Sequence, residues 1–105
     1  MSETAEGIEN ILRVLGSRQR LQIIEYLLQG NNTTEIAKRL MLSKATTSQH
    51  MHILLEARIV KKSILSNQHP HRGISYRVND NAKELVMSIQ KACYDFFNSL
   101  SSAEK

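Results

Sequence analysis

The chain has one cysteine, Cys93, and no apolar run that approaches the length needed to cross a bilayer. A single cysteine cannot form an internal disulfide, so nothing in the sequence calls for an oxidising compartment. The opening stretch MSETAEGIEN lacks the basic start and the apolar run of a secretory signal. We therefore expect a soluble, cytoplasmic protein that has no membrane partner.

Recognisable catalytic residue sets are also missing. The sequence shows no Ser/His/Asp arrangement, no phosphate-binding loop and no pair of catalytic carboxylates. His69, His71 and Asp80 lie in one region but do not form a known set. We predict that the chain is not an enzyme and uses no cofactor.

Acidic residues are scarce in the middle of the chain. Between Lys38 and Arg77 there are eight basic residues and one acidic residue, Glu56, so this segment carries a formal charge of +7. The whole chain carries +4, which leaves −3 for the remaining residues. Such a segment is either a lysine-rich solvated surface or the footprint of nucleic-acid binding.

The first half of the chain has the apolar periodicity of helices. Apolar residues at helical spacing predict helices at about 5–15 and 18–29. The stretch TTEIAKRL, residues 33–40, is predicted to be a short helix capped by Asn32, and Ser43 is predicted to cap a helix at 44–57. Two short helices joined by three or four residues form a helix-turn-helix.

The pattern changes after Arg58. Residues 59–60 and 63–65 are predicted to be extended, as is the alternating segment ISYRV at 74–78. The intervening SNQHPHRG has the Asn, Pro and Gly of a turn, so a basic hairpin wing is expected at 63–78. A last amphipathic helix is predicted at about 80–100. With 41% hydrophobic content, residues 1–105 suffice for one domain, a mainly α winged helix-turn-helix with a β-hairpin wing.

The terminal helices are predicted to form a dimer interface. The small central core can cover only one face of each, and the last helix carries more apolar surface than a monomer leaves exposed. We therefore expect a symmetric homodimer. Its predicted interface residues are Ile8, Ile11, Leu12, Leu85, Ile89, Cys93 and Phe96.

Three blocks of this sequence resemble the ArsR/SmtB family of bacterial winged-helix repressors. They are LRVLGSRQRLQII at 12–24, EIAKRLMLSKATTSQHMHILLEARIVKK at 35–62, and ISYRV at the end of the hairpin. The resemblance runs from about Leu12 to Phe97. It implies a homodimer joined through the first and last helices that binds operator DNA, and many such proteins release DNA when a metal ion binds.

Two positions depart from the family pattern. Arg18 stands where the family often has proline, and Met41 stands where the turn usually has glycine. A left-handed backbone costs a residue other than glycine roughly 1 kcal/mol or more. We therefore expect the turn at Met41 to differ locally.

The resemblance also indicates where metal sites would lie. The family's thiolate pair, C-x-C, aligns with Asn32 and Thr34, which supply no thiolate. The second family pattern, D-x-H-x10-H-x2-E, aligns with Asp80, Ala82, Cys93 and Phe96. Of these four residues, only Asp80 and Cys93 could still act as ligands, so we predict no metal site of the usual family type.

His50 and His52 invite a metal interpretation because they are two residues apart. On a helix they are separated by about 200°, so they cannot readily share one ion. His50 matches a position where the family often has histidine or glutamine at the boundary between the domain and DNA, which implies a supporting role. His52 is expected to reach phosphate or solvent.

The outward face of the helix 44–57 has the chemistry of a major-groove reader. Gln49 can pair with adenine, and Lys44 and Ser48 can bond to guanine or phosphate. Ala45 is small enough to touch a thymine methyl group. The predicted DNA-binding residues are Lys38, Lys44, Ala45, Thr46, Ser48, Gln49, His50, His52 and Arg72.

Two features leave alternatives open. At the wing tip, His69 and His71 could bind zinc only with help, and a solvated wing whose Arg72 reaches a minor groove or phosphate is favoured. Protonation of that tip would tighten DNA binding at mildly acidic pH. Cys93 is either a small hydrophobe on the apolar stripe or a thiol whose oxidation releases DNA.

The sequence as a whole favours a dimeric repressor. We expect it to read an inverted-repeat operator, with half-sites about 34 Å apart, through two copies of the helix 44–57 and the wing. No inducer is assigned. The alternative is a winged helix that binds a protein partner, which calls for an acidic or apolar face in place of the basic, polar one.

Overall fold

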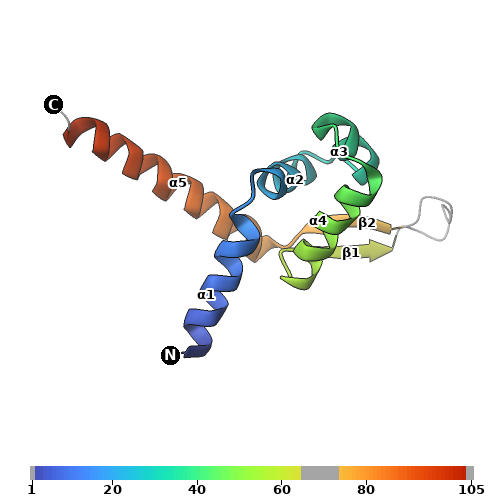
Figure 1. Cartoon of the computed structure of the whole chain (residues 1–105), viewed down its shortest axis with the longest axis horizontal. Helices are drawn as coiled ribbons and strands as arrows, with labels where there is room; N and C mark the ends of the chain where they lie inside the picture. Colours follow the sequence, from blue (N-terminus) through green and yellow to red (C-terminus); the bar gives the residue numbers. More distant parts are fainter. Residues whose placement is uncertain (1, 65–73, 104–105) are drawn as a thin grey trace.

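A computed structural model describes residues 2–64 and 74–103 (Figure 1). The described residues form five α-helices and two β-strands, in an order that confirms the predicted mainly α winged helix-turn-helix. The first helix begins earlier than predicted and the last ends later. The elements are α1 (Ser2–Leu15), α2 (Arg18–Leu28), α3 (Thr33–Leu40), α4 (Lys44–Glu56), β1 (Val60–Ile64), β2 (Ile74–Val78) and α5 (Asp80–Ala103).

Polar caps fix the starts of the two helices of the helix-turn-helix. The Asn32 side chain accepts a hydrogen bond from the Glu35 backbone N–H at 2.8 Å, and the Glu35 carboxylate accepts one from the Asn32 N–H at 2.9 Å. This reciprocal pair is a capping box. At α4, the Ser43 hydroxyl oxygen accepts from the Thr46 N–H at 3.0 Å. Both predicted caps are confirmed.

The turn between α3 and α4 corrects one expectation. Met41 has φ 56° and ψ 41°, which is the left-handed conformation that glycine usually takes. The Met41 N–H donates to the Lys38 carbonyl at 3.2 Å and the Leu42 N–H donates to the Ala37 carbonyl at 2.9 Å. This Schellman pattern satisfies two carbonyls at the end of α3. The prediction of a locally different turn was therefore wrong, because the hydrogen bonds offset the backbone strain.

The strands pair in one antiparallel register, from Val60 opposite Val78 to Ile64 opposite Ile74. Lys61 and Lys62 belong to β1, so the strand is continuous where the sequence predicted two short extended pieces. A left-handed residue, Arg58 with φ 61°, ends α4 and directs the chain into β1. The wing tip lies outside the described residues, and with it lie His69, His71 and Arg72.

The core lies where α2, α3, α4 and β1 meet. Its fully buried large side chains are Ile23, Ile24, Ile36, Leu54 and Val60. From the terminal helices, only Val14 and Leu15 at the end of α1 and Ala82 and Val86 at the start of α5 join this cluster. Figure 1 shows the rest of α1 and α5 projecting away from it.

The projecting helices make the chain extended. The radius of gyration is 16.3 Å, whereas a compact domain of this length would have about 13 Å. Residues 90–101 of α5 are all exposed. Neither α5 nor any other helix among the described residues is long and apolar enough to cross a membrane.

Candidate nucleic-acid interface

Helix α4 has one face in the core and one face in solvent. Thr47, Met51 and Leu54 are buried, as predicted. The opposite face is exposed, also as predicted, and it presents Lys44, Ala45, Ser48, Gln49 and His52. The face that could meet a duplex is therefore polar and basic.

The first turn of α4 is held by its own hydroxyl groups. The Ser43 hydroxyl donates to the Thr46 hydroxyl oxygen at 2.9 Å, and the Thr47 hydroxyl donates to the Ser43 carbonyl at 2.9 Å. Thr46, a predicted DNA contact, is half-buried and already bonded to Ser43. The Thr46 N–H donates to the Ser43 side chain and the Thr47 N–H donates to the Ser43 carbonyl. The N–H groups of Lys44 and Ala45 are therefore the ones that could meet an approaching phosphate, which the helix dipole favours.

A groove of about 570 Å³ runs between α3, α4 and the strands. Lys38 borders it from α3, Lys44 from α4 and Lys62 from β1, with Tyr76 of β2 beside them. No aspartate or glutamate is among the residues that line it. The groove therefore brings together Lys38 with three of the predicted α4 residues, Lys44, Ser48 and His52, on one cationic surface.

Lys62 and Tyr76 were not among the predicted site residues. They lie directly opposite each other in the antiparallel pair and both line the groove. The basic pair Lys61-Lys62 was visible in the sequence, but only the strand register shows which of the two lies beside α4.

His52 lies on the exposed face, as predicted. Its Nε2 is 3.0 Å from a carboxylate oxygen of Glu56, one turn further along α4, and both side chains are about 71% exposed. Exposed pairs of this kind contribute less than about 1 kcal/mol. The pair therefore does not prevent His52 from turning toward a phosphate.

His50 lies away from this face. It is half-buried against α2, where its ring nitrogens meet Arg20 and Gln19. Burial, and then the nearby Arg20 charge, lower the pKa of His50 below its ordinary value of 6.5. The structure thus separates His50 from the exposed residues of α4, and its predicted contact with DNA stays a prediction.

The residues that align with the family's metal ligands do not gather in one place. Asn32 caps α3, Ala82 is buried in the core, and Cys93 is exposed on α5. Among residues 2–64 and 74–103, no group of three His, Cys, Asp or Glu side chains could hold a metal ion.

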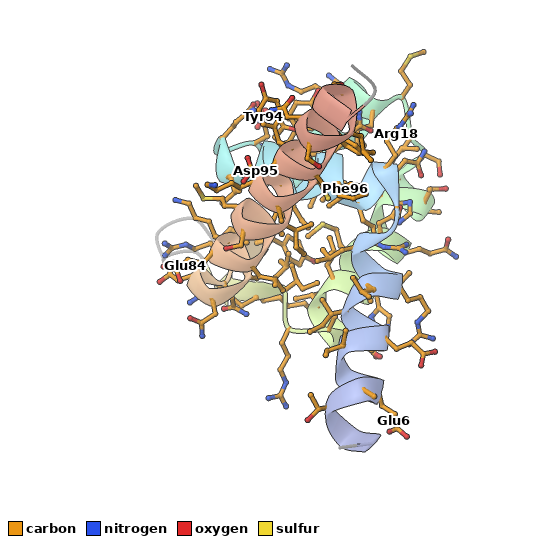
Figure 2. All side chains as sticks on the ribbon, turned by 90° about the vertical axis from the view of Figure 1, so that its left-hand side faces the viewer. Glu6, Arg18, Glu84, Tyr94, Asp95 and Phe96 are labelled. Carbon is orange, nitrogen blue, oxygen red and sulfur yellow. The ribbon has the colours of Figure 1, made fainter. Side chains whose placement is uncertain are left out.

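The predicted dimer residues fall into two groups. Ile11, Leu85 and Ile89 are half-buried against the core. The others are exposed, with Ile8 at 53%, Leu12 at 58% and Phe96 at 58%, and Cys93 is exposed as well. Figure 2 looks onto α5 and shows its side chains, Tyr94 and Phe96 among them, standing out from the helix. Four further apolar side chains of α5 are exposed that were not among the predicted interface residues: Met87, Tyr94, Phe97 and Leu100.

The part of the chain that carries this surface matches a known protein family. Residues 17–62, which contain α2, α3, α4 and the start of β1, match the family described as bacterial regulatory protein, arsR family. The resemblance to the ArsR family is confirmed. A search of curated proteins found no match.

Solved structures share the fold. The homodimeric winged helix-turn-helix domain of Mb0332 from Mycobacterium bovis, a possible ArsR-family regulator, has a TM-score of 0.75 at 19% identity, covering 90% of this chain and 84% of that one. The transcriptional repressor BigR from Xylella fastidiosa has a TM-score of 0.66 at 25% identity, covering 95% and 92%. A mutant of MepR from S. aureus, bound to an oligodeoxyribonucleotide, has a TM-score of 0.69 at 16% identity, covering 96% and 78%.

Proposed function

We propose that this ArsR-family chain is a homodimeric, sequence-specific DNA-binding repressor. In this proposal, α4 of each protomer lies in a major groove of an inverted-repeat operator. The observation that carries the proposal is the exposed face of α4, where Gln49, Ser48 and Lys44 stand beside a groove lined by lysines and no carboxylates. The family match over 17–62 covers this same face.

The roles on this surface divide by chemistry. Gln49 carries an acceptor and a donor on one planar amide, so it reads adenine. Lys44 and Ser48 bond to guanine or phosphate, and Ala45 contacts a thymine methyl group. Lys38 and Lys62 neutralise phosphates along the groove, which supplies affinity without sequence preference. Thr46, His52 and Arg72 are proposed as further DNA contacts, as the sequence predicts. His50, which lies against α2, is proposed to support the interface.

The homodimer is supported by the exposed apolar surface of the two projecting helices. Ile8 and Leu12 on α1, and Phe96 on α5, are more than half exposed in a single chain. Full burial of one large apolar side chain is favourable by about 1.5 to 3 kcal/mol relative to leaving it in water. Covering these side chains would therefore stabilise the protein. A second copy covers α1 and α5 together and holds two α4 helices at one fixed separation. Mb0332, a structural neighbour, is homodimeric.

The test is fluorescence anisotropy on the DNA upstream of the protein's own gene and on a scrambled duplex of equal length, across a salt series. We expect tighter binding to the upstream DNA than to the scrambled duplex by about 10³-fold or more. The scrambled duplex should show the steeper relative loss with salt, because phosphate contacts dominate there. Equal, weak binding to both duplexes would contradict sequence-specific repression and would favour a winged helix that binds a protein partner.

The thiol-responsive form of the repressor rests on Cys93. The structure leaves this residue exposed on α5, beside residues of the proposed dimer interface. Oxidation there would place a polar or bulky group in that interface. Wild-type protein and a Cys93→Ser variant are compared by anisotropy before and after mild oxidation. Loss of DNA binding in the wild type alone supports the thiol response, and identical behaviour of both removes it.

A further inference from the structure

Arg20 of α2 connects two other helices through one guanidinium group. Its Nε donates to the Val14 carbonyl at 2.6 Å and its Nη2 donates to the Arg13 carbonyl at 3.3 Å. These carbonyls lie at the end of α1, where no further turn of helix supplies a donor. Its Nη1 lies 3.3 Å from Nδ1 of His50 on α4. The same side chain therefore joins a proposed dimerisation helix to the proposed recognition helix.

The second ring nitrogen of His50 has its own partner. Nε2 lies 2.9 Å from the side-chain oxygen of Gln19, also on α2. A guanidinium can only donate hydrogen bonds, so Nδ1 must accept from Arg20. Nε2 then carries the proton and donates to Gln19. One neutral tautomer of His50 satisfies both contacts, and the other neutral tautomer does not.

A proton added to His50 removes the first of these contacts. Both ring nitrogens then carry hydrogen, so Nδ1–H would point at the Arg20 guanidinium, and the two groups would be like charges. Arg13 on α1 adds positive charge nearby, although its own guanidinium donates to the Asn10 side chain. One carboxylate, Glu56, lines the same hollow as Arg13 and Arg20 but pairs with His52.

The sign of the stability effect follows from the pKa of His50, which burial and Arg20 lower below 6.5. The folded chain then binds fewer protons than the unfolded chain in mildly acidic solution. The contribution of the contact to stability is present above about pH 6.5. It is lost as the pH falls below that value through the lower pKa of the folded state.

We propose that Arg20, Gln19 and His50 form a proton-sensitive link that positions α4 against α1 and α2, and that protonation of His50 releases α4 and weakens DNA binding. The DNA part of this proposal rests on the proposed function. Arg20 and Gln19 are positioning residues, because they act on DNA only through α4.

The direction of the pH effect separates this link from ordinary histidine contacts with DNA. A histidine that touches phosphate gains charge in acid and binds more tightly, as the sequence predicts for the wing tip. The link at His50 predicts the opposite. A variant at His50 therefore isolates its contribution from that of the other histidines.

The DNA experiment measures anisotropy on the upstream duplex at about pH 7.5 and about pH 5.5, on either side of the ordinary histidine pKa. His50→Gln keeps an acceptor and a donor but does not titrate. We define the acid loss as the affinity at the higher pH divided by the affinity at the lower pH. This acid loss should be larger in wild type than in His50→Gln by roughly fivefold or more, a typical coupling between sites. His52→Gln, the matched control on the exposed face, should retain that loss. An equal acid loss in wild type and His50→Gln, or a smaller loss in wild type than in His50→Gln, would overturn the link.

A second experiment needs no DNA. An NMR titration of the free protein follows the ring protons of His50 and the Nε–H of Arg20. We expect the His50 pKa below 6.5 in wild type and raised in Arg20→Gln, with the Arg20 Nε–H losing protection from exchange as His50 protonates. Arg20→Lys keeps the positive charge but lacks the several N–H donors of a guanidinium. It should therefore lose the hydrogen bonds to the carbonyls at the end of α1 while leaving a cation near His50.

The two experiments fail independently. If the NMR titration shows the coupled behaviour but no duplex binds specifically, the link stands and the proposed function is wrong. If DNA binds specifically but His50 titrates without regard to Arg20, the proposed function stands and the link is wrong.

Discussion

The centre of this chain, the helix-turn-helix, and its ends, α1 and α5, differ in how far they bury their apolar side chains. In the helix-turn-helix, each helix start is capped, the core side chains Ile36 and Leu54 are fully buried, and one exposed face of α4 is left polar. In α1 and α5, only the segments nearest the core are buried, and Ile8, Leu12 and Phe96 remain exposed. The difference agrees with the proposed homodimer, in which the centre is complete within one chain and a second chain covers the ends.

The largest expected effect is the loss of the proposed dimer interface between the terminal helices. Phe96→Glu places a charge in the proposed dimer interface and should weaken dimerisation by about 2 kcal/mol or more, as loss of a buried aromatic anchor does. Sedimentation velocity measures the dimer fraction over a concentration series. Lys91→Gln is the control, because Lys91 is exposed on the same helix and bonds only to Asp95, at 2.9 Å. A monomeric wild type, or equal dimer fractions in wild type and Phe96→Glu, would contradict the account.

The next substitution alters the DNA-binding face of α4 and leaves the proposed dimer interface unchanged. Gln49→Ala removes the amide that we propose reads adenine, so it should cost about 1 to 3 kcal/mol on the upstream duplex and much less on the scrambled one. Anisotropy on both duplexes gives the two losses. A similar loss on both would show that Gln49 does not read a base.

A smaller effect is expected for the cationic groove. Lys62→Gln should weaken binding to both duplexes alike and lower the magnitude of the salt slope by about 1, because one phosphate contact is lost. Lys91→Gln again serves as the control, since it removes the same charge far along α5. If Lys62→Gln changed the preference between the duplexes, Lys62 would be a base contact.

The smallest expected effect concerns stability. Met41→Gly should raise the free energy of unfolding by up to about 1 kcal/mol, because glycine takes the left-handed backbone without strain. Met87→Gly, at an exposed position inside α5, should lower it by about 1 kcal/mol. Urea unfolding of the two variants compares the same substitution in two backbone settings. Equal signs would show that Met41 is not strained.

Much of the centre could be predicted because its signals are local. Each helix start is marked by a cap that bonds to a residue three positions later, Asn32 for α3 and Ser43 for α4. Helical spacing alone gives the buried positions of α4, which are Thr47, Met51 and Leu54. The Met41 turn was misjudged because its strain is offset by hydrogen bonds that its residue type does not reveal.

The rest of the site depends on contacts between distant parts of the chain. Arg20 and His50 are thirty residues apart, and no periodicity links them. The strand register puts Lys62 opposite Tyr76, and the packing of the strands against α4 puts both of them in the groove. Such contacts appear only when the helices and strands are packed, so the sequence named the face of α4 but not the side chains that hold it in place.

The most direct test of the central claim is the number of protomers on one operator. Sedimentation of the labelled upstream duplex with the protein, whose chain mass is 12.0 kDa, measures the mass of the complex. The account predicts a complex of one duplex and two chains, which Phe96→Glu fails to form at the same concentration. A specific complex that contains a single chain, or one that Phe96→Glu forms equally well, would contradict the division of roles between α4 and the terminal helices.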